Sequence, residues 1–147
     1  MANHTYDYPR PAVTADVAVV SVEERPRVLL ILRKQDPFAD CWALPGGFVN
    51  AGERLIDAAM RELKEETGIE AFALEQLHSF GDPGRDPRGW TITIAYLARV
   101  HRDQVKPVAA DDAASVEWFP LDELPKLAFD HAAILQRVKT RLADRSL

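Results

Sequence analysis

The sequence predicts a mixed α/β fold in which helices pack on the faces of a central sheet. More segments have strand patterns than helix patterns, several strands follow one another directly, and strands do not alternate strictly with helices. The chain has 147 residues, of which 47% are hydrophobic and 28% charged, as is usual for one globular domain. We therefore expect a single domain over 1–147, with an extended N-terminal arm over 1–12 that is rich in tyrosine and proline.

The expected strands are runs of Val, Ile, Leu and Ala that end at turn-forming residues. A turn over 23–26 is expected to join the first two strands as a hairpin, and Pro45 followed by two glycines interrupts the chain after the third. The segments predicted as strands are 14–22, 28–33, 42–44, 48–49, 71–80, 91–100 and 115–119.

Two helices are predicted, the first over 54–67 and the second after Asp130, whose side chain can cap the first turn. Gly68 follows the first helix, where a C-terminal cap favours a positive φ. The apolar positions at helical spacing are Ile56, Ala59, Met60 and Leu63 in the first helix and Ile134, Leu135, Val138 and Leu142 in the second.

Composition excludes several classes of function. A net charge of −5 does not favour nucleic acid as a partner, because phosphate backbones bind basic surfaces. The chain has no run of 18 apolar residues and no signal-peptide pattern, so neither a membrane nor secretion is expected. The single cysteine, Cys41, cannot form an internal disulfide and is expected to be a buried structural residue. These observations predict a cytoplasmic protein.

Three carboxylates lie close together on the first predicted helix. Glu62, Glu65 and Glu66 are spaced i, i+3 and i+4, so they share one face, which we expect to be turned away from the apolar stripe. Taken alone, such a face is usually solvated surface. A divalent cation is the alternative, because it removes the repulsion between the charges, and magnesium prefers oxygen ligands together with substrate phosphates. Gly46 and Gly47 allow the backbone to approach a ligand closely.

The complete pattern resembles the signature of the Nudix hydrolases, G-x5-E-x7-R-E-U-x-E-E-x-G-U, where U is aliphatic. The matching residues are Gly47, Glu53, Arg61, Glu62, Leu63, Glu65, Glu66, Gly68 and Ile69. The resemblance implies an α/β/α sandwich with a mixed sheet, in which the motif forms a loop, a helix and a second loop. It also implies metal-dependent hydrolysis of a nucleoside diphosphate derivative, in which Mg²⁺, or Mn²⁺, is held at Glu62, Glu65, Glu66 and Gly46. Arg61 and Glu53 are then expected to pair and to brace the loop.

A general base is expected from outside the motif in many members of that family. Asp112, six residues before Trp118, is the first candidate and Asp111 the second. A carboxylate of this kind accepts a proton from the attacking water. For both residues, an ordinary solvated position in a loop is equally compatible with the sequence.

Further segments resemble the ADP-ribose pyrophosphatase branch of the family; they are 8–11, 42–49, 80–83, 85–89 and 127–131. Arg85 and Arg88 can donate to a diphosphate, Asp82 or Asp86 can accept from ribose hydroxyls, and Tyr6, Tyr8 or Trp90 can stack on adenine. The alternatives are surface ion pairs, Arg85–Asp82 and Arg88–Asp86, worth about 0–1 kcal/mol each. Trp42 and Trp118 are expected in the core, and His131 as a structural or surface histidine.

The resemblance favours hydrolysis of ADP-ribose to AMP and ribose 5-phosphate. The alternatives are another nucleoside diphosphate derivative, such as NADH, a sugar nucleotide or an oxidised dNTP, and a non-catalytic ADP-ribose-sensing domain. Related regulators add a DNA-binding winged helix, for which the sequence up to Leu147 leaves no room after the last predicted helix. By analogy with the family we expect a homodimer, in which the arm containing Tyr6 and Tyr8 makes an exchanged contact.

Overall fold

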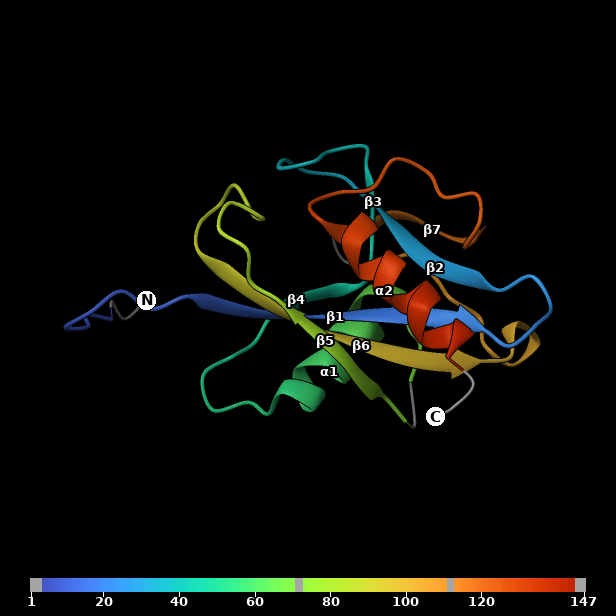
Figure 1. The fold of residues 1–147 in the computed structure, drawn as a ribbon, viewed down its shortest axis with the longest axis horizontal. Helices are drawn as coiled ribbons and strands as arrows, with labels where there is room; N and C mark the ends of the chain where they lie inside the picture. The colour runs from blue at the N-terminus through green and yellow to red at the C-terminus, as the bar shows by residue number, and fades with distance from the viewer. Residues whose placement is uncertain (1–3, 71–72, 111–112, 145–147) are drawn as a thin grey trace.

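The computed structural model describes residues 4–70, 73–110 and 113–144, and its elements follow the predicted order (Figure 1). The strands are β1 (Ala12–Ser21), β2 (Arg27–Arg33), β3 (Trp42–Ala43), β4 (Gly46–Phe48), β5 (Glu75–Phe80), β6 (Thr91–Val100) and β7 (Ala113–Pro120). The helices are α1 (Leu55–Thr67), the short 3-10 helix η1 (Arg102–Gln104) and α2 (His131–Ala143). Every predicted strand and helix is therefore present, with ends displaced by a few residues.

The seven strands form one mixed sheet, as predicted. Its main path runs β3-β2-β1-β6-β5, while β4 pairs with β1 and β7 pairs with β2. The two longest strands, β1 and β6, are parallel along their whole length, and the other pairings are antiparallel. Consequently β1 lies at the centre, and its first half is placed against both β4 and β6.

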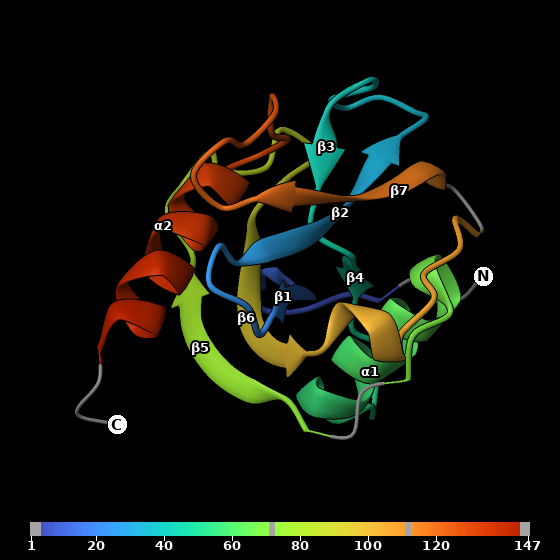
Figure 2. The same ribbon diagram turned by 90° about the vertical axis from the view of Figure 1, so that its right-hand side faces the viewer.

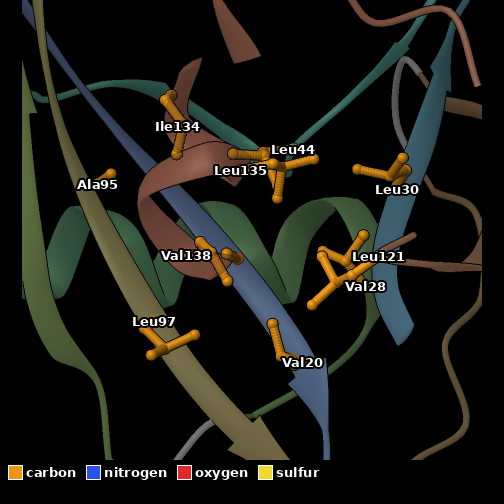
Figure 3. Packing of buried hydrophobic residues seen from close by; sticks show 11 residues of the cluster. Val20, Val28, Leu30, Leu44, Ala95, Leu97, Leu121, Ile134, Leu135 and Val138 are labelled. Carbon is orange, nitrogen blue, oxygen red and sulfur yellow. The ribbon is translucent and has the colours of Figure 1, made fainter. Parts of the chain in front are cut away.

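Helices cover the two faces of the sheet, α1 behind and α2 in front in Figure 1 and on opposite sides in Figure 2. Alternation along β1 supplies both cores, because successive side chains of a strand point to opposite faces. Val17 and Val19 belong to the core under α1, whereas Ala18 and Val20 belong to the core under α2. Figure 3 shows Ile134, Leu135 and Val138 of α2 directed at the sheet. This is the α/β/α sandwich that the sequence predicted.

The apolar stripe of α1 differs from the predicted one. The fully buried positions are Ala58, Ala59 and Leu63, joined by Thr67. Glu62 and Glu66 follow Ala58 at i+4 and i+8, so they lie on the buried side. The expectation that the whole acidic face points away from the core was therefore wrong. The helix ends as predicted at Gly68, whose φ is 76°.

The N-terminal segment behaves as an arm. Residues 4–11 contain no strand or helix, and the segment leads away from the body of the protein in Figure 1. Tyr6 and Tyr8 are 48% and 64% exposed, and the Arg10 guanidinium lies 3.8 and 5.2 Å from their ring centres.

Cys41 is buried, as predicted. Within the described ranges, no helix combines the length and the apolar character needed to cross a membrane.

Candidate active site

A pocket of about 510 Å³ opens where the motif helix meets the central strands. Its acidic wall is formed by glutamates of α1, and the basic side chains that also line it come from the end of β2 and from the loop before β6. The residues that carry its chemistry are Asp16, Arg33, Gly46, Gly47, Phe48, Glu62, Glu65, Glu66, Arg85, Arg88, Phe129 and His131. Most of the predicted site residues therefore meet in one pocket.

Glu66 is the most deeply placed of the three motif carboxylates. Its Oε1 accepts a hydrogen bond of 2.8 Å from the Gly46 N–H, which connects α1 to β4. Burial disfavours the charged form, and the neighbouring carboxylates of Glu62 and Asp16 add to the effect, so the pKa of Glu66 rises to about 8. Burial likewise raises the pKa of Glu62.

Arg61 holds the motif together, as the sequence predicted. Its Nε donates to Glu53 Oε2 over 2.7 Å and its Nη2 to Glu53 Oε1 over 2.9 Å, a two-point contact that fixes the loop before α1. Nη2 also donates to the Phe48 carbonyl at 3.0 Å, and Nη1 donates to Glu62 Oε1 at 2.7 Å. One guanidinium therefore orients the loop, the strand β4 and a carboxylate of the site.

The acidic wall suits a divalent cation. Burial disfavours the ionised forms of Glu62 and Glu66, the charge of Glu62 adds to this effect at Glu66, and a divalent cation bound beside them would offset both effects. Glu65 is more exposed and lies 3.4 Å from Arg61 Nη1. Among the described residues, no group of three or more acidic, histidine or cysteine side chains is already arranged to hold a metal ion. Gly46, the fourth predicted ligand, has its N–H directed at Glu66.

The raised pKa of Glu66 has a consequence for stability. The folded protein keeps this proton up to about pH 8, whereas the unfolded chain releases it near pH 4.5. The stabilisation of the folded state that results from this difference is therefore fully present below pH 4.5 and is lost as the pH rises to 8. Without metal, the free energy of unfolding of the wild type is expected to fall relative to that of Glu66→Gln by a few kcal/mol over this range. Urea denaturation of both proteins in EDTA measures the difference. A difference that does not change with pH would contradict the burial of an ionisable Glu66.

The two glycines before the motif helix have different steric roles. A Cβ on Gly46 would lie 2.4 Å from the Ala15 carbonyl oxygen, a backbone atom that cannot move without disturbing β1. A Cβ on Gly47 would lie 2.5 Å from the Glu62 carboxylate carbon, which is held in place by Arg61. Close approach of backbone and carboxylate therefore explains both residues.

A pair of variants separates these roles. Gly47→Ala is expected to displace the Glu62 carboxylate and to weaken the apparent affinity for a divalent cation about 10- to 100-fold, with little change in stability. Gly46→Ala is expected instead to lower the free energy of unfolding by about 1–3 kcal/mol, because the clash is with backbone. Calorimetric titration with divalent cations and thermal unfolding test the two. Equal cation affinity in Gly47→Ala and the wild type would rule out the steric role assigned to Gly47.

Arg85 does not pair with Asp82. Its guanidinium forms a two-point contact with Asp130, at 2.9 and 2.6 Å, and its side chain is 5% exposed. Asp130 precedes α2, but its carboxylate makes no capping bond, because Arg85 occupies it. The predicted side-chain cap was therefore wrong. Asp82 is exposed and borders a second pocket, which the motif carboxylates do not line.

Arg88 and Asp86 form the predicted ion pair, but it is not a simple surface pair. Asp86 is 4% exposed; burial opposes its ionisation, yet the hydrogen bonds from Arg88 outweigh this and lower the pKa of Asp86. The Arg88 guanidinium lies between two rings, 4.9 Å from the centre of Phe48 and 5.2 Å from that of Phe129. These contacts fix the loop before β6 against the pocket.

Sequence analysis did not identify Asp16, Thr93, Arg33 or Phe129 as site residues, and it predicted His131 as a structural or surface histidine. The Thr93 hydroxyl donates over 2.6 Å to Oδ2 of Asp16, which lines the pocket. His131 accepts the Leu44 N–H at Nδ1 over 3.0 Å, and its Nε2 lies 3.9 Å from Asp16 Oδ2. Burial lowers the pKa of His131, so the ring is neutral with its proton on Nε2. For Asp16, the sequence did contain a signal of a functional residue, namely an aspartate within a strand that is otherwise rich in valine.

Other predicted residues are not brought to the pocket. Tyr8 and Trp90 are 64% and 52% exposed and, like Tyr6, do not line it. Trp42 and Trp118 pack against the two cores, as expected. Asp112, the candidate base, and Asp111 lie outside the residues that the structure describes, so their role stays a prediction.

The fold and the pocket together define the class of protein. It is a three-layer α/β protein with one cavity that is lined by an acidic helix and by basic side chains. Such a cavity suits an anionic ligand that is associated with a metal ion. Residues 11–138 match the family model described as the NUDIX domain. The chain therefore belongs to the Nudix family, and the predicted resemblance is confirmed.

Three similar proteins place it within the family. An ADP-ribose pyrophosphatase of Methanocaldococcus jannaschii is 45% identical over 88% of this chain and 73% of that protein. The ADPR responsive transcriptional repressor NtrR of Acinetobacter baylyi is 40% identical over 95% of this chain and 58% of the repressor. The NUDIX domain of Shewanella oneidensis NrtR, solved as a cocrystal with ADP ribose, is 30% identical with a TM-score of 0.82, covering 94% of each chain. The chain thus spans little more than half of the repressor.

Proposed function

We propose that this protein is a metal-dependent hydrolase that cleaves ADP-ribose to AMP and ribose 5-phosphate. The observation that carries the proposal is the pocket that is lined both by Glu62 and Glu66, carboxylates with raised pKa values, and by Arg33 and Arg88. This arrangement suits a diphosphate that is neutralised from two sides. The identity to the archaeal ADP-ribose pyrophosphatase favours ADP-ribose over other nucleoside diphosphates.

The metal is proposed to be Mg²⁺, with Mn²⁺ as an alternative, held by Glu62, Glu65 and Glu66 with Gly46. Bound there, it would supply charge neutralisation at the diphosphate. The chain's own residues perform the positioning: Arg61 and Glu53 brace the loop, and the Gly46 N–H orients Glu66. A carboxylate outside the motif, for which Asp112 is the candidate, is proposed to accept the proton of the attacking water.

Incubation with Mg²⁺ or Mn²⁺ and a panel of ADP-ribose, NADH, ADP-glucose and 8-oxo-dGTP tests the function. We expect release of AMP from ADP-ribose at a kcat/KM at least tenfold above that for the other compounds. Preferential cleavage of another member would reassign the substrate while leaving the hydrolase intact. Binding of ADP-ribose without turnover of any compound would favour the second candidate, an ADP-ribose sensor, which the similarity to the ADPR responsive repressor NtrR and to the ADP ribose-bound NUDIX domain of NrtR supports.

We also propose that the protein is a cytoplasmic homodimer. The exposed aromatic rings of Tyr6 and Tyr8 on the extended arm support a contact with a second copy, and the free, buried Cys41 suits a reducing compartment. Light scattering is expected to give twice the chain mass, and removal of residues 1–9 is expected to give a monomer. A wild type with the mass of one chain would exclude the dimer.

A further inference from the structure

Two buried polar side chains of the pocket have hydrogen-bonding groups that the protein itself does not use. Asp16, on β1, and His131, the first residue of α2, are 7% and 3% exposed, and both line the pocket. Neither Asp16 Oδ1 nor His131 Nε2 has a hydrogen-bond partner in the part of the chain that the structure describes. A carboxylate oxygen accepts and an imidazole N–H donates, so the pair offers one acceptor and one donor.

The tautomer of His131 is fixed by a backbone contact. Its Nδ1 accepts the Leu44 N–H over 3.0 Å, which requires a lone pair on that nitrogen. The ring is neutral, so its single proton is on Nε2. A nitrogen that carries a proton does not bind a metal ion, and a neutral ring does not attract a phosphate by charge. The Nε2–H of His131 is therefore a donor suited to an uncharged acceptor.

The Asp16 carboxylate is also held in one orientation. Its Oδ2 accepts the Thr93 hydroxyl over 2.6 Å. Its Oδ1 occupies the space that a side chain on residue 46 would fill, because it lies only 2.1 Å from the position of a Cβ added to Gly46. Asp16 and Gly46 are opposite each other in the β1–β4 pairing, so the glycine leaves room for the carboxylate.

Both free atoms are accessible from the pocket. Among the described residues, every side-chain nitrogen or oxygen atom that is shut off from solvent has a hydrogen-bond partner. Asp16 Oδ1 and His131 Nε2 have none, so solvent reaches them, and the pocket is the cavity that both residues line. Nε2 lies 3.9 Å from Asp16 Oδ2, which is too far for a direct hydrogen bond. A hydroxyl group, which both donates and accepts, can bridge the ring and the carboxylate.

The charges around this pair disfavour a phosphate as its ligand. Burial raises the pKa of Glu66, and the Asp16 carboxylate adds to the effect. A phosphate beside Asp16 would increase this repulsion between like charges. Arg85, the cation that Asp16 attracts, is occupied by Asp130. An uncharged hydroxyl avoids the repulsion and uses both free groups, and ribose rings supply such hydroxyls in a nucleoside diphosphate derivative.

We propose that Asp16 and His131 bind a ribose hydroxyl of the substrate, with Asp16 as the acceptor and the Nε2–H of His131 as the donor. The inference rests on the proposed function, because it presumes a substrate that contains ribose, and it names the residues that recognise this sugar. It replaces the sequence-based assignment of this role to Asp82 or Asp86. Asp82 does not line the pocket, and Asp86 is bound by Arg88.

Calorimetric titration with ribose 5-phosphate and with AMP, in the presence of Mg²⁺, tests the proposal. Each compound carries one of the two ribose rings of ADP-ribose, and neither contains a diphosphate bond, so hydrolysis does not interfere. Asp16→Asn keeps the shape and can still accept from Thr93, but it presents an NH₂ donor in place of Oδ1. We expect it to raise the dissociation constant of one compound about 10- to 100-fold, the usual effect of losing a hydrogen bond to a charged group. The affected compound identifies the ribose ring.

Analogues of the affected compound that each lack one ribose hydroxyl separate recognition from a structural role. One analogue is expected to bind the wild type about 10- to 100-fold more weakly than its parent compound does. Asp16→Asn is expected to bind this analogue and the parent equally, because the hydrogen bond is already lost. If Asp16→Asn weakened the parent and all of its analogues by the same factor, Asp16 would have a structural role only, and the proposal would be wrong.

The outcomes separate this proposal from the proposed function. Asp122→Asn is the matched control, because the Asp122 side chain is 63% exposed and lies outside the pocket. Equal binding of both compounds by Asp16→Asn and the wild type, or no binding by the wild type, would overturn the proposal even if ADP-ribose is cleaved. Weaker binding by Asp16→Asn but not by Asp122→Asn would support it even without hydrolysis. If Asp16→Asn does not fold, the same titrations of His131→Asn decide, because asparagine can still accept the Leu44 N–H but lacks the Nε2–H.

Discussion

Replacing Glu66 with glutamine is expected to lower kcat about 1000-fold while leaving the fold intact. Glutamine has the same shape, and its amide oxygen can still accept the hydrogen bond from the Gly46 N–H. The amide has no negative charge with which to hold a divalent cation. Metal-assisted charge stabilisation is worth several kcal/mol, and each 1.4 kcal/mol is about tenfold in rate. AMP release under saturating ADP-ribose and Mg²⁺, together with circular dichroism, measures both effects.

Glu70→Gln is the matched control for this experiment. Glu70 follows α1, is exposed, and pairs with Lys64 at 2.8 Å outside the pocket. The same chemical change should therefore leave kcat at the wild-type value, since solvent-exposed ion pairs contribute little. If Glu66→Gln retained the wild-type rate, Glu66 would not be an essential ligand, and the assignment of the acidic wall would be wrong.

Replacing Arg85 with alanine is expected to reduce the free energy of unfolding by about 3–5 kcal/mol, the usual effect of removing one partner of a buried ion pair. Arg85 is 5% exposed at its side chain and ties the loop before β6 to the start of α2. Its loss leaves the Asp130 carboxylate, which is 25% exposed, without its cation. The burial of Arg85 disfavours its charge, but the bonds to Asp130 outweigh this and raise the pKa of Arg85.

Arg25→Ala is the comparison for Arg85→Ala. Arg25 also binds a carboxylate at two points, that of Asp122, but the two side chains are 55% and 63% exposed. Water replaces the lost bonds there, so no measurable change in stability is expected. The double variant of Arg85→Ala with Asp130→Ala is expected to be more stable than Arg85→Ala alone. Wild-type stability of Arg85→Ala with a raised KM would instead restore the original prediction that Arg85 contacts the substrate.

The sequence by itself determined the local features of the site. Glu53, Arg61, Glu62, Glu65 and Glu66 lie within 14 consecutive residues, and helical spacing is enough to place four of them next to each other. The positive φ of Gly68 also followed from a local rule, since only a residue without a Cβ adopts it at little cost. Strand and helix periodicity in turn gave the mixed sheet and its two covering helices.

The tertiary structure decided which charges neutralise each other and which remain available. Arg85 and Asp130 are 45 residues apart, and Thr93 and Asp16 are 77 apart, so no local pattern could pair them. The burial of Glu66 also depends on how α1 is rotated against β4 and β1, which the spacing of the glutamates does not fix. Sequence periodicity describes neighbours along the chain, whereas the acid strength of Glu66 and the tautomer of His131 follow from what packs around them.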